Sequence, residues 1–488
     1  MNMVRVRFAP SPTGYVHIGS LRTALYNYLY AKKMGGSYIL RIEDTDQKRF
    51  VEGSMENLIG CLEKTGILHD EGPTYVDGEL VENGDFGPYI QSDRLDLYKE
   101  HLRVLLEEGH AYPCFCSKER LEEVREAQRQ QNLTPKYDGH CRNLSREEAQ
   151  DRIMNGEEFV IRLKMPVNEE ITFFDEVRGQ VTINSDEVDD QVLIKSDGFP
   201  TYHFAVVVDD HLMGITHVIR GEEWLPSTPK HVLLYQAFGW EQPTYVHLPN
   251  ILNADKKKLS KRQGDVAVED FLAKGYLPEA LVNYIALLGW SPDTNEEIFS
   301  MDELVQHFDL KRVNKSGAVF DVKKLKWMNG EYIRKMPMDV LVDKTLPYMV
   351  QSGYVSAEDG EKNRDHLEKI VDTFVEKMDT LADIKEELEN IFVYRLEESP
   401  EVEEMLQLDT TSLLVKAALK KMEDAENFEP DTLKKIFKEI QKEEGIKGKN
   451  LFMPARIIAT GQMHGADLMK IMSILGKEEV MDRFRRFI

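Results

Sequence analysis

The stretch from 4 to 46 constrains the fold of this chain more than any other. Apolar residues alternate with arginines over 4–8, which predicts a strand with two faces. Prolines and a glycine break regular structure over 10–14, and from about Gly19 apolar residues recur at helical spacing. A second apolar strand is predicted over 37–43. The resulting β-α-β unit places the amino end of a helix at the carboxyl edge of a parallel sheet, where phosphates bind.

The loop ahead of the predicted helix lacks both G-x-G-x-x-G and G-x-x-x-x-G-K-[ST], so it indicates neither the usual dinucleotide fold nor a P-loop. His17 can instead donate a hydrogen bond to a phosphate oxygen, although a structural or surface histidine explains this residue equally well. Far downstream, positions 256–262 hold five cations in seven residues. On its own, such a run favours a solvated loop.

The totals limit the class of protein. With 488 residues the chain is too long for one core, and about three domains are expected. It contains no run of ~18 apolar residues that could span a membrane, and its start leads directly into a strand rather than a signal peptide. Its four cysteines form no disulfide framework. We therefore expect a cytoplasmic protein. The net charge of -24 argues mildly against a nucleic-acid partner, but basic clusters over 311–326 and 442–456 are compatible with binding through one face.

Two segments taken together change this interpretation. His17-Ile18-Gly19-Ser20 at a strand–helix junction resembles the HIGH motif of class I aminoacyl-tRNA synthetases, and Lys258-Leu259-Ser260-Lys261-Arg262 resembles their KMSKS motif. The flanking sequences Arg-Phe-Ala-Pro-Ser-Pro-Thr-Gly (7–14) and Arg-Ile-Glu-Asp-Thr-Asp (41–46) narrow the resemblance to bacterial-type glutamyl-tRNA synthetases. The resemblance covers nearly the whole chain.

The resemblance implies an α/β fold in which a Rossmann-like class I catalytic domain carries an inserted α+β domain for the tRNA acceptor end, followed by an all-α anticodon-binding region. The expected segments are the first half of the catalytic domain (1–110), the inserted domain (111–190), the second half of the catalytic domain (191–252), the KMSKS-like loop with a stem-contact domain (253–337) and the anticodon-binding region (338–488).

The residue pattern beyond 190 supports an alternation of strands and helices. The apolar runs 191–195, 200–205 and 206–210 are followed by one more β-rich run, 215–219, which ends at Arg220. Beyond Pro337 helical spacing dominates, with acidic and basic residues interspersed.

The implied reaction has two steps and uses ATP and Mg²⁺. The α-carboxylate of glutamate attacks the α-phosphate of ATP, and a terminal ribose hydroxyl of tRNA(Glu) then takes the glutamyl group. Such phosphate displacement needs positioning and charge stabilisation rather than a protein nucleophile. The catalytic residues implied by the resemblance are His17, Gly19, Lys258 and Lys261. The implied ATP-binding residues are Pro10, His17, Gly19, Ser20, Lys258, Ser260 and Lys261.

Selection of glutamate is an electrostatic problem, because the substrate offers two carboxylates and one ammonium. Arg7 and Arg220 are planar forks suited to carboxylates, and Glu43 suits the ammonium. For Arg220 a structural salt bridge is the alternative role. Some relatives carry Asn in this pocket where the chain has Val206, with His203 nearby as a substitute. The glutamate-binding residues that the resemblance implies are Arg7, Ala9, Ser11, Glu43, Tyr202, Arg220 and Trp224.

Three cysteines are spaced like zinc ligands. Cys114, Cys116 and Cys141 form a C-x-C-x24-C pattern. Some relatives complete the set with a histidine two residues after the third cysteine, where this chain has Asn143. His140 could serve only if the loop turns back. A structural zinc and small, partly buried cysteines without a metal therefore stay open as alternatives.

Three rival interpretations are weaker. A glutaminyl-tRNA synthetase shares both motifs, but its first loop typically reads Pro-Pro-Glu-Pro-Asn-Gly where this chain has Ala-Pro-Ser-Pro-Thr-Gly at 9–14. A glutamyl-queuosine tRNA synthetase lacks the helical C-terminal region, and a scaffold or RNA-binding protein with an inactive nucleotide fold disagrees with the intact motifs. We expect a monomer. Charging of tRNA(Gln) stays open, because Lys377 is the nearest match to the arginine with which discriminating relatives read the anticodon.

Overall fold

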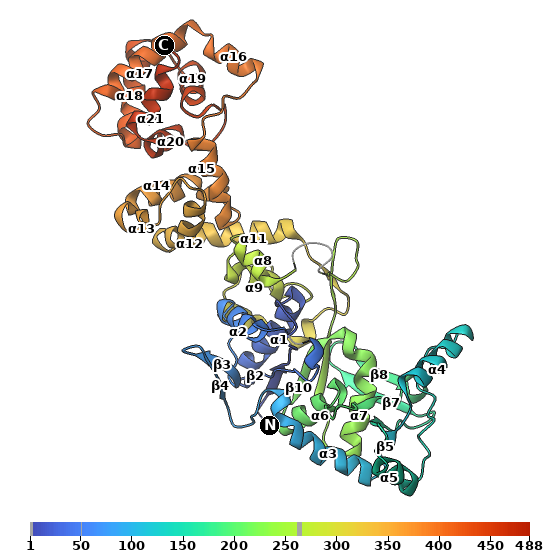
Figure 1. Cartoon of the computed structure of the whole chain (residues 1–488). Helices are drawn as coiled ribbons and strands as arrows, with labels where there is room; N and C mark the ends of the chain where they lie inside the picture. The colour runs from blue at the N-terminus through green and yellow to red at the C-terminus, as the bar shows by residue number, and fades with distance from the viewer. Residues whose placement is uncertain (1–2, 50, 261–265) are drawn as a thin grey trace. The chain divides into compact units, whose positions relative to one another are not determined.

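The computed structural model describes residues 3–49, 51–260 and 266–488 (Figure 1). Lys261, predicted to act in catalysis, lies outside the described residues. The chain divides into two compact units, one of Met1–Phe271 with Leu281–Asp321 and one of Leu272–Ala280 with Val322–Ile488. The segment expected over 253–337 is thus divided between the two units.

The first unit is built on a parallel sheet. Strand β1 (Arg5–Phe8) pairs with β2 (Ser37–Leu40), and β10 (His217–Gly221) pairs with β11 (Thr244–Leu248), both in parallel. The two pairs are joined at Arg5, whose carbonyl oxygen accepts a hydrogen bond from the residue before β10. The carboxyl ends of β1, β2 and β10 therefore meet at one edge of the sheet, where open α/β folds bind ligands.

Helix α1 (Ile18–Lys33) lies against β1, β2 and β10. Its apolar residues at helical spacing, among them Leu21 and Leu25, are buried. Gly36 is needed where the chain returns to the sheet, because a Cβ there would collide with the carbonyl oxygen of Val4. The β-α-β unit predicted from the sequence is confirmed.

Two stretches fold differently from their sequence expectation. The runs 200–205 and 206–210 were expected among the β-rich runs, but residues 202–210 belong to helix α6 (Tyr202–Leu212). The glycine- and aspartate-rich stretch up to residue 87, whose composition is typical of a loop, contains a hairpin of β3 (Gly72–Val76) and β4 (Glu79–Asn83). Because α6 is buried from Phe204 to Asp210, the packing of its surroundings overrides the strand preference of its valines.

Between the two halves of the parallel sheet, the chain forms antiparallel structure. One sheet has the order β5-β6-β9, and β7 and β8 form a hairpin whose first strand meets β11 at Tyr245. Helix α4 buries none of its residues. The bounds are β5 (Ala111–Cys114), α4 (Lys118–Gln130), α5 (Arg146–Met154), β6 (Val160–Leu163), β7 (Glu170–Asp175), β8 (Gly179–Asn184) and β9 (Val192–Ile194).

The first unit contains several further helices and short strands. Two more helices have residues in both units, because the division of the chain falls within them. The first group comprises α2 (Ser54–Lys64), α3 (Leu95–Glu107), α7 (Thr228–Ala237), β12 (Ile251–Leu252), α10 (Met301–His307) and β13 (Ala318–Val319). The crossing helices are α8 (Val268–Ala273) and α9 (Pro278–Ala286).

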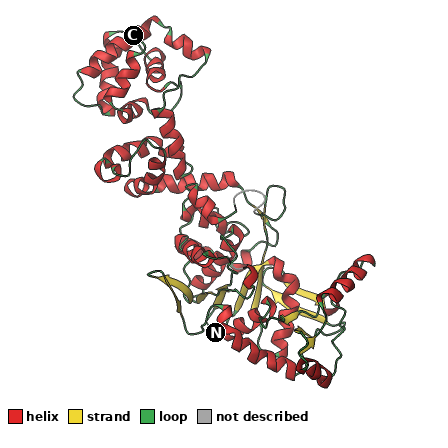
Figure 2. Ribbon diagram, in the orientation of Figure 1, coloured by secondary structure: helices red, strands yellow, loops and turns green. Residues whose placement is uncertain are grey.

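The described residues of the second unit form helices joined by loops and contain no strand, as Figure 2 shows by colour. Its amphipathic helices bury apolar stripes; in α18, for example, Leu433, Ile436, Phe437 and Ile440 are buried. No helix in the described part of the chain has the length and apolar character to cross a membrane. The helices are α11 (Val322–Lys335), α12 (Met338–Gln351), α13 (Asp359–Lys362), α14 (Arg364–Phe374), α15 (Ile384–Phe392), α16 (Pro400–Leu406), α17 (Asp409–Glu423), α18 (Pro430–Glu443), α19 (Lys449–Thr460), α20 (Leu468–Leu475) and α21 (Lys477–Arg485).

Candidate active site

A cleft of about 620 Å³ opens at the carboxyl ends of β1, β2 and β10 and at the amino ends of α1 and α6. Most of the residues predicted to bind glutamate or ATP line it together, although they come from segments as far apart as 7 and 224. They are Arg7, Ala9, Pro10, Ser11, Gly19, Ser20, Glu43, Tyr202, Arg220 and Trp224.

Arg220 supplies a buried positive charge to this cleft, and its side chain is held by neutral groups. Its Nε donates to His247 Nε2 at 3.0 Å, and its Nη1 donates to His231 Nδ1 at 3.1 Å. Its Nη2 donates to Thr228 Oγ1 at 3.0 Å, and Tyr202 Oη lies 3.3 Å from Nη1. Among the described residues no carboxylate forms an ion pair with this guanidinium, so the structural salt bridge considered from the sequence is absent.

The histidines around Arg220 are neutral. Burial lowers the pKa of His247 to about 4 and that of His203 to about 3, and it holds the pKa of His231 well below its usual value. Because Arg220 can only donate, His231 Nδ1 accepts and its Nε2 carries the proton, which it donates to His203 Nδ1 at 3.1 Å. The charge of Arg220 is therefore uncompensated by its neighbours, and a buried cation of this kind calls for an anionic ligand.

Arg7 differs from Arg220, although both were predicted to bind carboxylates. Its Nε and Nη2 hold the two oxygens of Asp210 at 2.9 and 3.1 Å, and all these groups are buried. Asp210 also accepts from Arg41 Nη1 at 2.8 Å. Arg7 therefore already has a carboxylate partner before any ligand binds.

Glu43 lies at the end of the second predicted strand and is buried in the wall of the cleft. Its Oε1 accepts a hydrogen bond from Arg41 Nη2 at 3.0 Å. Burial raises the pKa of Glu43 to about 7, while the charges of Arg41 and Arg7 act in the opposite direction. The carboxylate is thus poised to gain from a cation that enters the cleft.

Two aromatic rings form another part of the wall. The ring centroids of Tyr202 and Trp224 lie 4.1 Å apart, with 33° between the ring planes. Aromatic pairs of this kind are rigid and apolar, so they exclude water from one side of the cleft.

The mouth of α1 fixes the protonation of His17. The residue is the N-cap of the helix, and its Nδ1 accepts a hydrogen bond from the Gly19 N–H at 2.9 Å. In the neutral ring the proton therefore sits on Nε2. The Gly19 N–H, expected to donate to a phosphate, is engaged by this cap. A Cβ at position 19 would lie 3.2 Å from His17 Nδ1, so the cap favours glycine there.

Lys258 stands on a hairpin that borders the same cleft. The turn after β12 closes where the Leu259 N–H donates to the Ile251 carbonyl at 2.9 Å, and Ser260 follows directly. The Nζ of Lys258 lies 3.9 Å from an oxygen of Glu223, which lines the cleft.

After residues 261–265, which lie outside the described residues, the chain returns to the mouth of α1. The Ile18 N–H donates to the Val266 carbonyl at 2.9 Å, and the Val268 N–H donates to the Val16 carbonyl at the same distance. The chain that follows the KMSKS-like motif, more than 230 residues from the HIGH-like motif in the sequence, thus pairs with the mouth of α1 in the first unit.

Comparisons with known proteins agree with this geometry. The family described as tRNA synthetases class I (E and Q), catalytic domain, matches residues 3–327, and an anticodon binding domain matches residues 340–488. The chain is 58% identical over 486 residues to a glutamate–tRNA ligase of Alkaliphilus metalliredigens, with 99% of each chain covered. It is 56% identical to a glutamate–tRNA ligase of Clostridioides difficile, with 98% of each covered. This chain belongs to the glutamate–tRNA ligase family.

A solved structure supports the same assignment. A glutamate tRNA ligase from Elizabethkingia meningosepticum, in complex with its amino acid, superposes with a TM-score of 0.89 at 36% identity, over 100% of this chain and 99% of that one. The expected fold class, a class I synthetase catalytic domain followed by an all-helical anticodon-binding domain, is confirmed.

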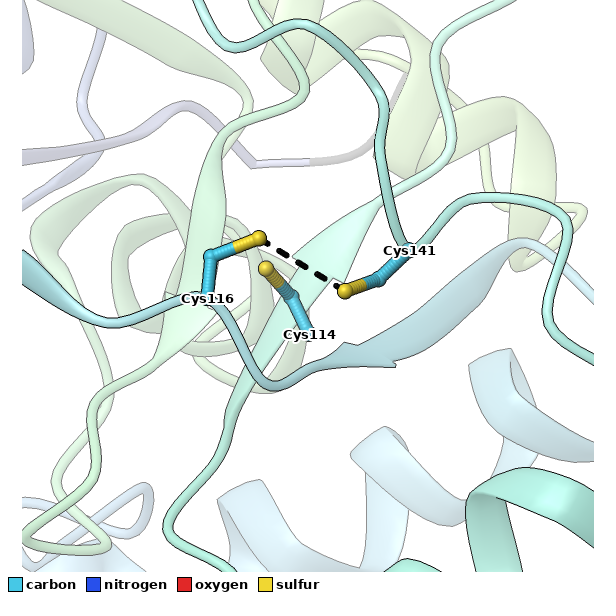
Figure 3. Close-up of side chains that lie close together, drawn as sticks. All are labelled: Cys114, Cys116 and Cys141. Carbon is cyan, nitrogen blue, oxygen red and sulfur yellow. Dashed lines mark hydrogen bonds between the residues drawn. The ribbon is translucent and has the colours of Figure 1, made fainter. Parts of the chain in front are cut away.

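The cysteines predicted as zinc ligands come together, as Figure 3 shows. The sulfurs of Cys114, Cys116 and Cys141 all lie within 4.8 Å of one another, and those of Cys116 and Cys141 are 3.6 Å apart. His140 is exposed and is not part of the cluster. Instead, Tyr137 Oη lies 3.3 Å from the sulfur of Cys114 and 3.7 Å from that of Cys116.

Gln91, Lys195 and Glu223 also line the cleft, although nothing in the sequence indicated them. None of them belongs to a recognisable motif, and only the chain fold brings them to the site. Val206, considered for the pocket, lies in the hydrophobic core. His203 does not line the cleft, but its ring contacts those of Tyr202 and Trp224 and its Nδ1 lies 3.1 Å from His231 Nε2. Lys377 lies in the second unit, where its Nζ is 3.3 Å from an oxygen of Glu387.

Proposed function

We propose that this chain is a glutamate–tRNA ligase that activates L-glutamate with ATP and transfers the glutamyl group to the terminal ribose of tRNA(Glu). The observation that carries the amino-acid choice is Arg220, a buried cation without an anionic partner among the described residues. A neutral glutamine side chain would leave this charge unmatched in a dry site, which costs several kcal/mol.

In this proposal Arg220 binds the side-chain carboxylate of glutamate, and Glu43 binds its ammonium. Arg7 adds positive potential beside them while it stays paired with Asp210. Tyr202 and Trp224 form the apolar wall, and Ala9 and Ser11 contribute the backbone beyond β1. The α-carboxylate is then presented toward the helix mouth, where ATP binds.

The activation step forms a bond between a carboxylate oxygen of glutamate and the α-phosphorus of ATP and releases diphosphate. His17 donates from Nε2 to a phosphate oxygen, Gly19 and Ser20 lie against the nucleotide, and Lys258 supplies charge from the opposite side. Lys261, in the undescribed part of the loop, is assigned the same role by motif alone. These donors stabilise the negative charge that spreads over the phosphates.

Mg²⁺ belongs to this chemistry, because it neutralises the phosphates of ATP. The acidic side chains that line the cleft besides Glu43 are Asp46 and Glu223, and their carboxylates are the oxygen ligands that Mg²⁺ prefers. They would hold the ion together with the phosphates.

For the tRNA, we assign the acceptor end to the inserted segment 111–190, a stem contact to 253–337 and the anticodon to 338–488. The anticodon-binding family that matches 340–488 supports the last assignment. A monomeric state is a further part of the proposal, and charging of tRNA(Gln) stays open between the two outcomes of the experiment below.

Aminoacylation of purified tRNA(Glu) and tRNA(Gln) with labelled glutamate tests the function directly. We expect charging of tRNA(Glu), and we expect exchange between ATP and diphosphate to require tRNA. Charging with glutamine in preference to glutamate would contradict the proposal. Exchange without tRNA would contradict only the tRNA requirement.

Acidification should weaken glutamate binding through Glu43. Its pKa is raised to about 7, so the carboxylate is present above this pH and is lost as the pH falls through it. We expect the KM for glutamate to increase up to about tenfold per pH unit below 7, because a neutral carboxyl cannot pair with the ammonium. Steady-state aminoacylation between pH 5.5 and 8.5 measures this, and Glu43→Gln should have a higher KM without that pH dependence.

We further propose a structural zinc held by Cys114, Cys116 and Cys141, with the phenol oxygen of Tyr137 as the fourth ligand. Burial, with the neighbouring sulfur of Cys114, raises the pKa of Cys116 to about 12, whereas, against the effect of burial, hydrogen bonds from Tyr137 and the nearby Arg162 lower the pKa of Cys114. Three sulfurs within 4.8 Å of one another fit a tetrahedral thiolate site. The metal would organise the inserted segment and take no part in the reaction.

Metal analysis of the purified protein should find about one zinc per chain. Cys141→Ser should lose most of this zinc and lower the Tm, while the KM for glutamate stays unchanged, because the cluster lies outside the cleft. Cys61→Ser, which alters a buried cysteine elsewhere, is the matched control and should keep its zinc. Zinc-free protein with an unchanged Tm would exclude the site.

A further inference from the structure

Gln91 is a buried amide in the wall of the cleft that uses only part of its hydrogen-bonding capacity. Its residue exposure is 0%, and it lines the cleft together with Arg7 and Glu43. Its Nε2 donates to Asp209 Oδ2 at 2.9 Å, but its Oε1 has no hydrogen-bond partner among the described residues. A buried acceptor left in this way is costly, which points to a donor that arrives with a ligand.

The orientation of the amide is determined by its surroundings. Asp209 can only accept hydrogen bonds, and it also accepts from Arg94 Nε at 2.6 Å and from Tyr98 Oη at 2.8 Å. A flipped amide would place the Gln91 oxygen against a carboxylate oxygen. The amide nitrogen therefore faces Asp209, and Oε1 is the end that is left for another partner.

Backbone pairing places Gln91 beside Glu43. The Ile42 N–H donates to the Tyr89 carbonyl at 2.9 Å, and the Gln91 N–H donates to the Ile42 carbonyl at 3.0 Å. Ile42 and Ile90 form a parallel bridge, so the next residues along each strand, Glu43 and Gln91, point to the same face. Neighbouring strands lie about 4.8 Å apart, which makes these two side chains adjacent acceptors.

We propose that Gln91 binds the α-ammonium of L-glutamate through Oε1, next to the carboxylate of Glu43. This inference rests on the proposed function and adds a binding residue to it. An ammonium carries three donors, so it can satisfy a carboxylate and an amide oxygen at once. Gln91 should contribute nothing to the affinity of an inhibitor that lacks the ammonium, such as glutarate.

The competing role for Gln91 is purely structural. Arg41 Nε is a buried donor without a hydrogen-bond partner among the described residues. It lies 3.9 Å from Asp209 Oδ2, the oxygen that accepts from Gln91 Nε2. Gln91 could serve to complete this buried network of charges. The two roles differ in one measurable way, since only ammonium binding distinguishes glutamate from glutarate.

The test compares Gln91→Met with Tyr98→Phe in aminoacylation of tRNA(Glu). Both variants remove one donor to Asp209 Oδ2, but only Gln91→Met removes Oε1, the oxygen proposed to bind the ammonium. For Gln91→Met we expect the KM for glutamate to rise about tenfold or more, with kcat within about threefold and the KM for ATP unchanged. The inhibition constant of glutarate should stay the same, and Tyr98→Phe should leave the KM for glutamate unchanged.

An unchanged KM for glutamate in Gln91→Met would overturn the inference, and so would an equal rise for glutarate or the same change in Tyr98→Phe. If Gln91→Met does not fold, Gln91→Asn shortens the side chain while keeping the amide, and the same split between glutamate and glutarate is expected. Each of these failures leaves charging at saturating glutamate intact. Absence of charging by the unmodified protein would instead defeat the proposed function.

Discussion

Replacing Arg220 by methionine should raise the KM for glutamate by roughly 30-fold to several thousandfold, because a desolvated charge pair in a binding site is worth about 2–5 kcal/mol. The KM for ATP should change little. The Tm should fall much less than the loss of glutamate binding would suggest. The variant removes a buried charge that has no carboxylate partner among the described residues of the free protein. Aminoacylation kinetics and thermal unfolding of the same preparations measure both effects.

Arg7→Met is the matched control for this prediction. Arg7 is equally buried, but it holds Asp210 with two hydrogen bonds. Its removal leaves that carboxylate with fewer partners, so it should reduce the free energy of unfolding by about 3–5 kcal/mol. Similar stability losses in both variants, with similar KM values, would show that Arg220 is a structural cation rather than the anion site.

The difference between Arg7 and Arg220 also marks the limit of the sequence analysis. Both are arginines near the ends of predicted strands, and both were expected to bind carboxylates. Asp210, which neutralises Arg7, lies 203 residues away along the chain. No local pattern indicates such a pairing, because it depends on how the sheet and α6 come together.

The fold was easier to predict from the sequence than the pairing of its side chains. The first β-α-β unit followed from local periodicity, because apolar residues alternate with arginines along β1 and recur at helical spacing along α1, although β1 is buried on both faces. Periodicity failed for α6, since a helix that is buried along most of its length shows no polar stripe and its valines look like a strand. Tyr137 was missed for a similar reason: its approach to the cysteines depends on the path of a loop.

His17 should be essential for glutamate activation. Removing a positioned donor to a charge that develops in the transition state typically costs about 100- to 1,000-fold in rate. Asparagine is the informative replacement, because its side-chain oxygen can still cap α1 by accepting from the Gly19 N–H, whereas it has no group in the place of Nε2. We therefore expect His17→Asn to lose activation, measured as exchange between ATP and diphosphate in the presence of tRNA, with a Tm close to that of the unmodified protein.

His17→Ala separates the cap from the chemistry. It removes both the acceptor for Gly19 and the donor, so it should lose the same activity and about 1 kcal/mol of stability in addition. Binding of tRNA and the KM for glutamate should be unchanged in both variants, since the histidine contacts phosphate in the proposed mechanism. If His17→Asn keeps full exchange while His17→Ala loses it, the histidine acts as the helix cap alone, and the phosphate contact must be assigned to another donor at the mouth of α1.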